Sequence, residues 1–263
     1  MNLTLTPIVR ILLIINIVVF AIQSLVPGFT DIFSFHSFSS PAFKPFQLVT
    51  YMFLHSTNGL GHIFGNMLGL FFFGPTLEQN VLGPKRFLTL YLVSGIGAGL
   101  LYAGINYWEL LQIRTAADLY AQYPSPDSFV DFWFKHSPNF ERQLTEFSNQ
   151  YETHLKDPEY IRQSINYVNQ FYDMCKDNPM VGASGAIFGI LMTFALIFPN
   201  REMYMMFIPF PIKAKYFVAG YALYELYNGV QHRESEVAHF AHIGGMVFAF
   251  ILVKLAWKLK QQY

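Results

Sequence analysis

Apolar residues recur in long stretches along this chain, separated by shorter polar segments. A helix needs about 20 mainly apolar residues to cross a bilayer. A weaker stretch near residues 212–227 carries Glu225 and several tyrosines. The clearer stretches are Pro7–Val26, Leu60–Leu77, Phe87–Tyr107, Met180–Phe198 and Phe240–Trp257. With the weaker stretch included, the pattern predicts an all-α membrane protein of six transmembrane helices.

Residues 108–179 break the apolar pattern and predict a soluble, acidic helical insertion between the third and fourth spans. Ser125 and Asp157 are each followed by a proline and an acidic residue, as in a helix cap and its first turn. Two apolar stripes recur at helical spacing, and we expect them to pack on each other. They are Phe140, Leu144, Phe147, Tyr151 and Leu155, and Ile161, Ile165, Val168, Tyr172 and Cys175. The predicted regions are therefore 1–107, 108–179 and 180–263.

Composition supports a membrane protein and the charges predict its orientation. Only 13% of residues are charged, about half the share in soluble domains. The sequence contains no basic stripe of the kind that would indicate nucleic-acid binding. Lys44 and Arg233 flank one face of the predicted bundle, whereas nine basic residues flank the other: Arg10, Lys85, Arg86, Arg201, Lys213, Lys215, Lys254, Lys258 and Lys260. The positive-inside rule places both termini in the cytoplasm and the insertion outside, in a multi-pass cell membrane (inner or plasma membrane).

The first apolar stretch has Arg10 near its start with an apolar run behind it, and in this respect it resembles a secretory signal. No small-x-small cleavage motif follows it, so we expect the segment to remain as a span.

Polar residues stand near the outer ends of the second, fourth and sixth spans. His62 and Asn66 lie one helical turn apart on one face, while Ser184 and His242 belong to the other two spans. Because these spans enter from the same side, we expect all four side chains at a similar depth. Small residues beside them predict close helix packing: Gly61, Gly65 and Gly69; Gly185 and Gly189; Ala241, Gly245 and Ala249.

This set of side chains indicates serine chemistry. A serine becomes a nucleophile when a neighbouring base takes its proton, and a neutral histidine suits that task. Ser184 and His242 supply the pair. Asn66, His62 and the Ser184 amide are candidate donors to the oxyanion of acyl transfer. Taken alone, the glycine-rich segment around Ser184 more often indicates packing than catalysis.

Other protease chemistries lack their residues. No aspartate falls within a predicted span, and the His-Glu-x-x-His zinc signature is absent. The single Cys175 excludes an intrachain disulfide. His239 and His242 have the spacing of a metal pair, but the sequence shows no third ligand. We expect no metal and no cofactor, and we expect His55, His239 and Glu225 to have structural roles.

Three motifs occur in order on the predicted spans: His62-x-x-x-Asn66, the Gly-Ala-Ser-Gly segment Gly182–Gly185, and Ala-His-x-Gly-Gly at Ala241–Gly245. Together they resemble the rhomboid intramembrane serine proteases. The resemblance implies a six-helix rhomboid-like bundle and a Ser184–His242 dyad without a third acidic member.

The resemblance also implies the roles of the neighbouring residues. His62, Asn66 and the Ser184 amide would form the oxyanion site, and Phe188 would pack against the catalytic histidine. Gly182, Gly185 and Gly245 would support the site. The implied substrates are single-span transmembrane proteins in the lipid bilayer, cleaved within or beside the membrane.

Two features depart from the family pattern. The first outer loop reads Lys-Pro-Phe-Gln-Leu-Val-Thr at Lys44–Thr50, where family members often carry Trp-Arg. The insertion at 108–179 is longer than the usual connection, and we expect it to shape substrate access or to bind an extracytoplasmic partner. One alternative is a catalytically inactive rhomboid-like protein that binds membrane helices. Another is a transporter or channel, which would lack the usual internal repeats and paired charges.

Overall fold

The computed structural model describes residues 5–203, 210–231 and 239–262, without the side chains of residues 138–143. Arg233 and the side chain of Phe140, both used in the sequence predictions, lie outside this description. Contacts divide the chain into two compact units. The first comprises residues 1–36, 42–103 and 179–263, and the second comprises 37–41 and 104–178.

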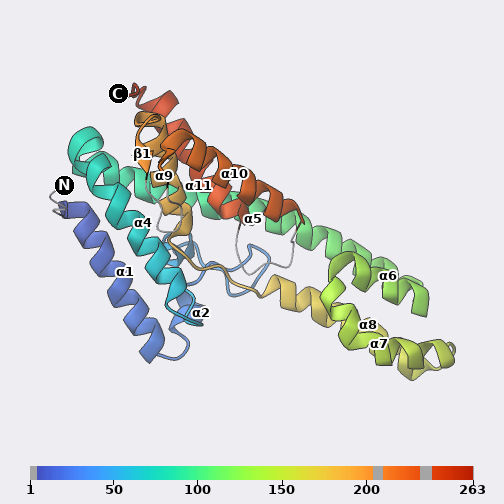
Figure 1. The fold of residues 1–263 in the computed structure, drawn as a ribbon. Coiled ribbons are helices and arrows are strands. Elements are labelled where there is room, and N and C mark those ends of the chain that lie inside the picture. The colour runs from blue at the N-terminus through green and yellow to red at the C-terminus, as the bar shows by residue number, and fades with distance from the viewer. Residues whose placement is uncertain (1–4, 204–209, 232–238, 263) are drawn as a thin grey trace. The chain divides into compact units, whose positions relative to one another are not determined.

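The first unit is built from apolar helices (Figure 1). The longer ones are α1 (Pro7–Leu25), α4 (Gly61–Leu77), α9 (Ser184–Ile197), α10 (Ala214–Gln231) and α11 (His239–Phe250). The short ones are α2 (Phe29–Phe33), α3 (Gln47–Thr50), η1 (Tyr51–Phe53), η2 (Glu78–Leu82) and η3 (Ile251–Ala256). The strands β1 (Glu202–Met203) and β2 (Ile212–Lys213) pair antiparallel, with Glu202 opposite Lys213.

Helix α5 (Gly83–Gln122) begins in the first unit and continues into the second. The predicted third span ends at Tyr107, and the helix continues beyond this point to Gln122. Leu110, Ala117 and Tyr120 continue a buried helical stripe, and no proline follows in the helix until after Gln122. The apolar pattern marks where a span ends, whereas the backbone remains helical until a breaker occurs.

The chain is an all-α membrane protein, as predicted. Among the described residues, three helical stretches are long and apolar enough to cross a bilayer: Pro7–Leu25, Gly61–Gln122 and His239–Ala256. The middle stretch has 62 residues and comprises α4, η2 and α5. Helix α9 is apolar but shorter, with 14 residues. The count of six spans therefore stays a prediction.

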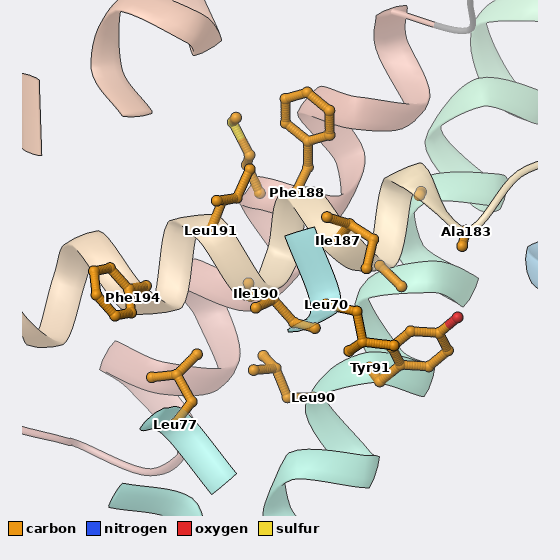
Figure 2. Close-up of a cluster of buried hydrophobic side chains, with 14 of the residues drawn as sticks. Leu70, Leu77, Leu90, Tyr91, Ala183, Ile187, Phe188, Ile190, Leu191 and Phe194 are labelled. Carbon is orange, nitrogen blue, oxygen red and sulfur yellow. The ribbon is translucent and has the colours of Figure 1, made fainter. Parts of the chain in front are cut away.

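Helix α9 forms the centre of the first unit. Eleven of its residues are buried, and it packs against α4, α10 and α11. Figure 2 shows Ile187, Ile190 and Phe194 of α9 with Leu70 of α4 and Tyr91 of α5. A helix that is apolar all round belongs inside a bundle, so the serine at its first residue is held by a rigid element.

Small residues bring α9 and α11 close together. A Cβ atom built on Gly245 would lie 1.9 Å from the carbonyl oxygen of Gly185, and one on Gly189 would lie 3.2 Å from the carbonyl oxygen of Gly245. The predicted α4 seam is only partly present. Gly69 meets Ile187, whereas in the described part of the chain no atom lies within 4 Å of a Cβ built on Gly61 or Gly65.

Glu78, at the end of α4, fastens the start of α1. Its carboxylate is buried and accepts hydrogen bonds from the backbone N–H groups of Ile8 and Val9, each at 3.0 Å, and from the Thr6 hydroxyl. The first N–H groups of a helix have no partner within it, and a carboxylate there also complements the helix dipole. One side chain therefore fixes α1 against α4.

The second unit has its own core. It contains α6 (Pro126–His136), α7 (Pro138–Thr153), α8 (Pro158–Lys176) and the last turns of α5. Ser125 and Asp157 cap α6 and α8 as the sequence predicted. The apolar stripes share one core containing Phe129, Trp133, Tyr151, Val168 and Phe171. The predicted hairpin of two helices is therefore a bundle of three helices and the end of α5, while Leu155 is exposed.

Candidate active site

Ser184 is the first residue of α9, and the backbone before it is tied to distant segments. Met180 and Phe35 exchange two backbone hydrogen bonds of 2.9 Å, and the Gly182 N–H donates to the Tyr51 carbonyl at 3.0 Å. Gly182 has a φ of 139°, which side chains rarely adopt. The first N–H groups of α9 lack intrahelical partners and form the positive end of its dipole, so Ser184 stands where negative charge is favoured.

His242 lies within hydrogen-bond distance of Ser184. Its Nε2 atom is 2.8 Å from the serine Oγ. The imidazole is buried and stacks on Phe188, with ring centroids 4.1 Å apart and planes at 10°. The close α9–α11 packing sets this distance, and the Phe188 ring limits rotation of the imidazole. The structure therefore brings together a hydroxyl and a base in the arrangement needed to activate a nucleophile.

His62 has its proton placed by the loop before α4. Its Nδ1 accepts the Ser56 N–H at 3.2 Å, so in the neutral ring the proton lies on Nε2 and that nitrogen is a donor. A Cβ atom built on Gly182 would lie 3.2 Å from Nε2 of His62 and 3.4 Å from Oγ of Ser184. Because residue 182 is glycine, no side chain occupies this position beside His62 Nε2 and Ser184 Oγ.

Asn66 is buried one turn after His62, and within the described residues its Nδ2 atom has no hydrogen-bond partner. A buried amide without a partner is costly in a folded protein. A buried amide donor without a partner is suited to donate a hydrogen bond to a substrate oxygen.

Glu225 of α10 lies beside His239 and His242, a contact that the sequence did not predict. Its carboxylate oxygen Oε2 lies 2.6 Å from Nδ1 of His239 and 2.9 Å from Nδ1 of His242. The resemblance implied no third acidic member beside the dyad, and the sequence showed no third ligand beside the two histidines. In the structure, the Glu225 carboxylate lies both beside the Ser184–His242 pair and beside the two histidines. It comes from the weakest of the predicted spans. A polar residue inside an apolar stretch was the only available signal.

The first loop, which departs from the family pattern, is organised by Gln47. This side chain is buried. It accepts the Lys44 N–H at 3.0 Å and donates to the carbonyls of Ile32 at 3.0 Å and Ala42 at 3.1 Å. The Gln47 side-chain amide therefore pairs with three backbone groups and fixes the loop that precedes Tyr51.

The fold and this cluster define a class: an all-α membrane protein with a serine at the start of a buried helix and a histidine beside it. A family model described as the Rhomboid domain matches residues 42–109 and 163–259. The chain belongs to the rhomboid family.

Two relatives agree with this membership. RHOMBOID-like protein 12, mitochondrial, of Arabidopsis thaliana is 26% identical over 206 residues, 78% of this chain. An uncharacterized mitochondrial rhomboid protein of Schizosaccharomyces pombe is 25% identical over 228 residues, 82% of this chain. The chain spans about half the length of these relatives, 44% and 52% respectively.

Proposed function

We propose that this protein is an intramembrane serine endopeptidase that cleaves transmembrane segments of membrane proteins. The observation that carries the proposal is the 2.8 Å separation between Ser184 Oγ and His242 Nε2 at the start of a buried helix. Membership of the rhomboid family supports an intramembrane protease-like fold. The finer assignment of a Ser-His mechanism rests on the side-chain arrangement.

In the proposed reaction, Ser184 attacks the scissile carbonyl carbon while His242 Nε2 takes the hydroxyl proton. The carbonyl oxygen becomes an oxyanion and accepts hydrogen bonds from His62 Nε2, Asn66 Nδ2 and the Ser184 N–H. Collapse of this intermediate breaks the C–N bond as His242 protonates the leaving amine. Water then attacks the acyl-enzyme with His242 again as base, which releases the acid and restores the serine.

A substrate helix must unwind locally before this attack, because its peptide bonds are shielded by their own hydrogen bonds. We therefore propose single-span transmembrane proteins as substrates, presented from the surrounding lipid bilayer. No cofactor is required for these steps.

Purified protein with a model single-span substrate tests the function. Ser184→Ala and His242→Ala should each abolish cleavage and labelling by a fluorophosphonate, while circular dichroism of the helices stays unchanged. Full cleavage by either variant would contradict the mechanism. A wild-type protein that binds the substrate helix without labelling would support the alternative, an inactive rhomboid-like protein that binds membrane helices.

The location is also a proposal. The charge bias favours a multi-pass inner or plasma membrane with both termini on the cytoplasmic side. The relatives are named mitochondrial, so the mitochondrial inner membrane, with the termini on the matrix side, is the competing location. Fractionation of cells that express the tagged chain distinguishes the two.

We propose that the second unit shapes substrate access or binds a partner outside the cytoplasm. A chain without residues 117–176 should retain fluorophosphonate labelling but cleave some natural substrates less efficiently. Unchanged cleavage of every natural substrate would contradict this role.

A further inference from the structure

A carboxylate lies buried beside the candidate dyad and needs a physical explanation. Glu225 is 2% exposed and lies in α10, a helix of the first unit. A charged side chain there is costly unless it is paired. Among the described residues, its carboxylate pairs with the imidazoles of His239 and His242. Because these histidines are three residues apart, both reach the same face of α11 and can share one acceptor.

We propose that Glu225 is a positioning residue of the protease reaction, which orients His242 toward Ser184 and stabilises its protonated form, with His239 holding the carboxylate in place. This inference rests on the proposed function, and it adds a third, acidic member to the serine and histidine pair. Glu225 acts through His242 and does not touch the substrate.

The two histidines contact Glu225 differently. His239 Nδ1 is hydrogen-bonded to Oε2 at 2.6 Å. His242 Nδ1 lies 2.9 Å from the same oxygen, yet its N–H is not aligned for a hydrogen bond. An attraction between a positive ring and a carboxylate depends on separation more than on this alignment. The attraction therefore strengthens when His242 Nε2 gains the serine proton, because the ring becomes positively charged while Nδ1 keeps its own proton.

The same contact selects the reactive tautomer. In neutral His242, a proton on Nδ1 faces the Glu225 carboxylate and leaves Nε2 as the acceptor for the Ser184 hydroxyl. The opposite tautomer would place a lone pair against a carboxylate and a proton against the hydroxyl that must be deprotonated. A buried carboxylate at this position therefore favours the form that can act as base.

A metal ion is the competing explanation, because the ligand atoms of Glu225, His239 and His242 all lie within 4.8 Å of one another. Two N or O ligands of a tetrahedral zinc ion are about 3.3 Å apart, given bonds of about 2.0 Å. The carboxylate to imidazole separations are 2.6 and 2.9 Å. Both are shorter than the separation between two ligands of one zinc ion, so they fit direct contact between carboxylate and imidazole better than a shared metal.

Substitutions in the full-length protein test the proposal, with the first-order rate of fluorophosphonate labelling of Ser184 and kcat for a model single-span substrate as the readouts. Glu225→Gln keeps the size of the side chain and removes its charge. We expect both rates to fall by about a hundredfold or more, as when the third member of a catalytic triad is neutralised, with KM changed by less than about threefold. Glu225→Asp should recover part of the loss, and His239→Gln should lose less than Glu225→Gln.

The matched control is Glu78→Gln, which neutralises another buried carboxylate, outside the site. It should lower the melting temperature because the hydrogen bonds from the start of α1 to Glu78 are weakened. The labelling rate per folded molecule should stay at the wild-type value. All rates are divided by the folded fraction, measured by circular dichroism, so that a poorly folding Glu225 variant still gives a result.

Each outcome is decisive for one of the two ideas. If Ser184→Ala abolishes labelling but Glu225→Gln labels within about threefold of wild type, the positioning role is wrong and the protease proposal stands. If Ser184→Ala cleaves normally, the proposed function itself fails. If a chelator raises the wild-type rate and added Zn²⁺ suppresses it in wild type but not in Glu225→Gln, the cluster is an inhibitory metal site and the positioning role is overturned.

Discussion

At the scale of single residues, the site depends on one missing side chain. The space between His62 Nε2 and Ser184 Oγ exists because residue 182 is glycine, and the local backbone holds it at a φ of 139°. The hydrogen bond from its N–H to Tyr51 maintains this conformation. On the proposed function, a side chain at position 182 would therefore compete with the oxyanion for this space.

Gly182→Ala should lower kcat/KM by at least about a hundredfold, the cost of losing an oxyanion donor. Steady-state cleavage of the model substrate measures this effect. Gly28→Ala is the matched control, because Gly28 also has a positive φ, of 79°, but a Cβ there meets no atom of the described chain within 4 Å. It should lose about 1 kcal/mol of stability and keep its activity per folded molecule. Equal activity losses in both variants would contradict the steric argument.

His55 gives a residue-scale prediction about pH. Burial lowers its pKa to about 4, and nearby His62 contributes to the lowering. An unfolded histidine titrates near 6.5, so between these values the unfolded state binds more protons. The stability contributed by neutral His55 is complete above pH ~6.5 and is lost as the pH falls through 4, by about 2 to 3 kcal/mol at pH ~4.5.

Thermal unfolding in detergent at neutral and acidic pH measures this loss. In His55→Phe, which keeps an aromatic ring beside Phe20 and His62, the fall in melting temperature toward pH 4.5 should be smaller. An identical fall in both proteins would assign the acid sensitivity to other groups.

The sequence predicted part of this site for a clear physical reason. Ser184 and His242 stand within short glycine-containing motifs, and polar groups in apolar spans are conspicuous. The position of Glu225 beside His242 depends on how α10 crosses α11, and residue spacing within one helix carries no information about that crossing. The protonation of His62 was equally hidden, because its partner is the backbone of Ser56.

At the scale of elements, close packing of α9 and α11 sets the distance between nucleophile and base. Gly245 allows this approach because the position of its absent Cβ lies 1.9 Å from the Gly185 carbonyl oxygen. The sequence predicted this seam from small residues four apart. It also predicted one along α4 from Gly61, Gly65 and Gly69, of which only Gly69 meets a neighbour among the described residues. Spacing identifies a ridge but not the helix that faces it.

Gly245→Ala should force α9 and α11 apart, lengthen the contact between Ser184 and His242, and destabilise the protein by about 1 to 3 kcal/mol through overpacking. Gly220→Ala, at an exposed helical position without neighbours among the described atoms, should be neutral or stabilising because alanine favours helix. Melting temperature and fluorophosphonate labelling of the two variants measure the difference. A stable and fully reactive Gly245→Ala protein would show that α9 and α11 can accommodate a Cβ at position 245.

At the scale of the whole molecule, two units with separate cores share one long helix, α5. The sequence predicted the soluble region from its loss of apolar character, and its helix caps from local signals. It did not separate α6 from α7, because the helix break at Ser137 and Pro138 was not recognised between the Ser125 cap and the stripe that begins at Phe140. Packing among α6, α7 and α8 involves aromatic residues such as Phe129 and Trp133, whose partners are distant in sequence.

The charge bias predicts that the second unit and the C-terminus lie on opposite sides of the membrane. In a Cys175→Ser background without other cysteines, Lys156→Cys should react with an impermeant maleimide from the outer side of intact cells or vesicles. Gln261→Cys should react only after permeabilisation. Both positions are exposed, so labelling of both from the same side would disprove the predicted orientation.

The pairing of Met180 with Phe35 has a consequence for biogenesis. The backbone that sets Gly182 and Ser184 takes its hydrogen bonds from segments made much earlier in synthesis, and His242 is made later still. A chain synthesised only as far as α9 therefore contains Ser184 and the segments that position its backbone, but not His242. On the proposed function, the protein would not hydrolyse neighbouring helices, including its own, until the whole bundle had assembled in the membrane.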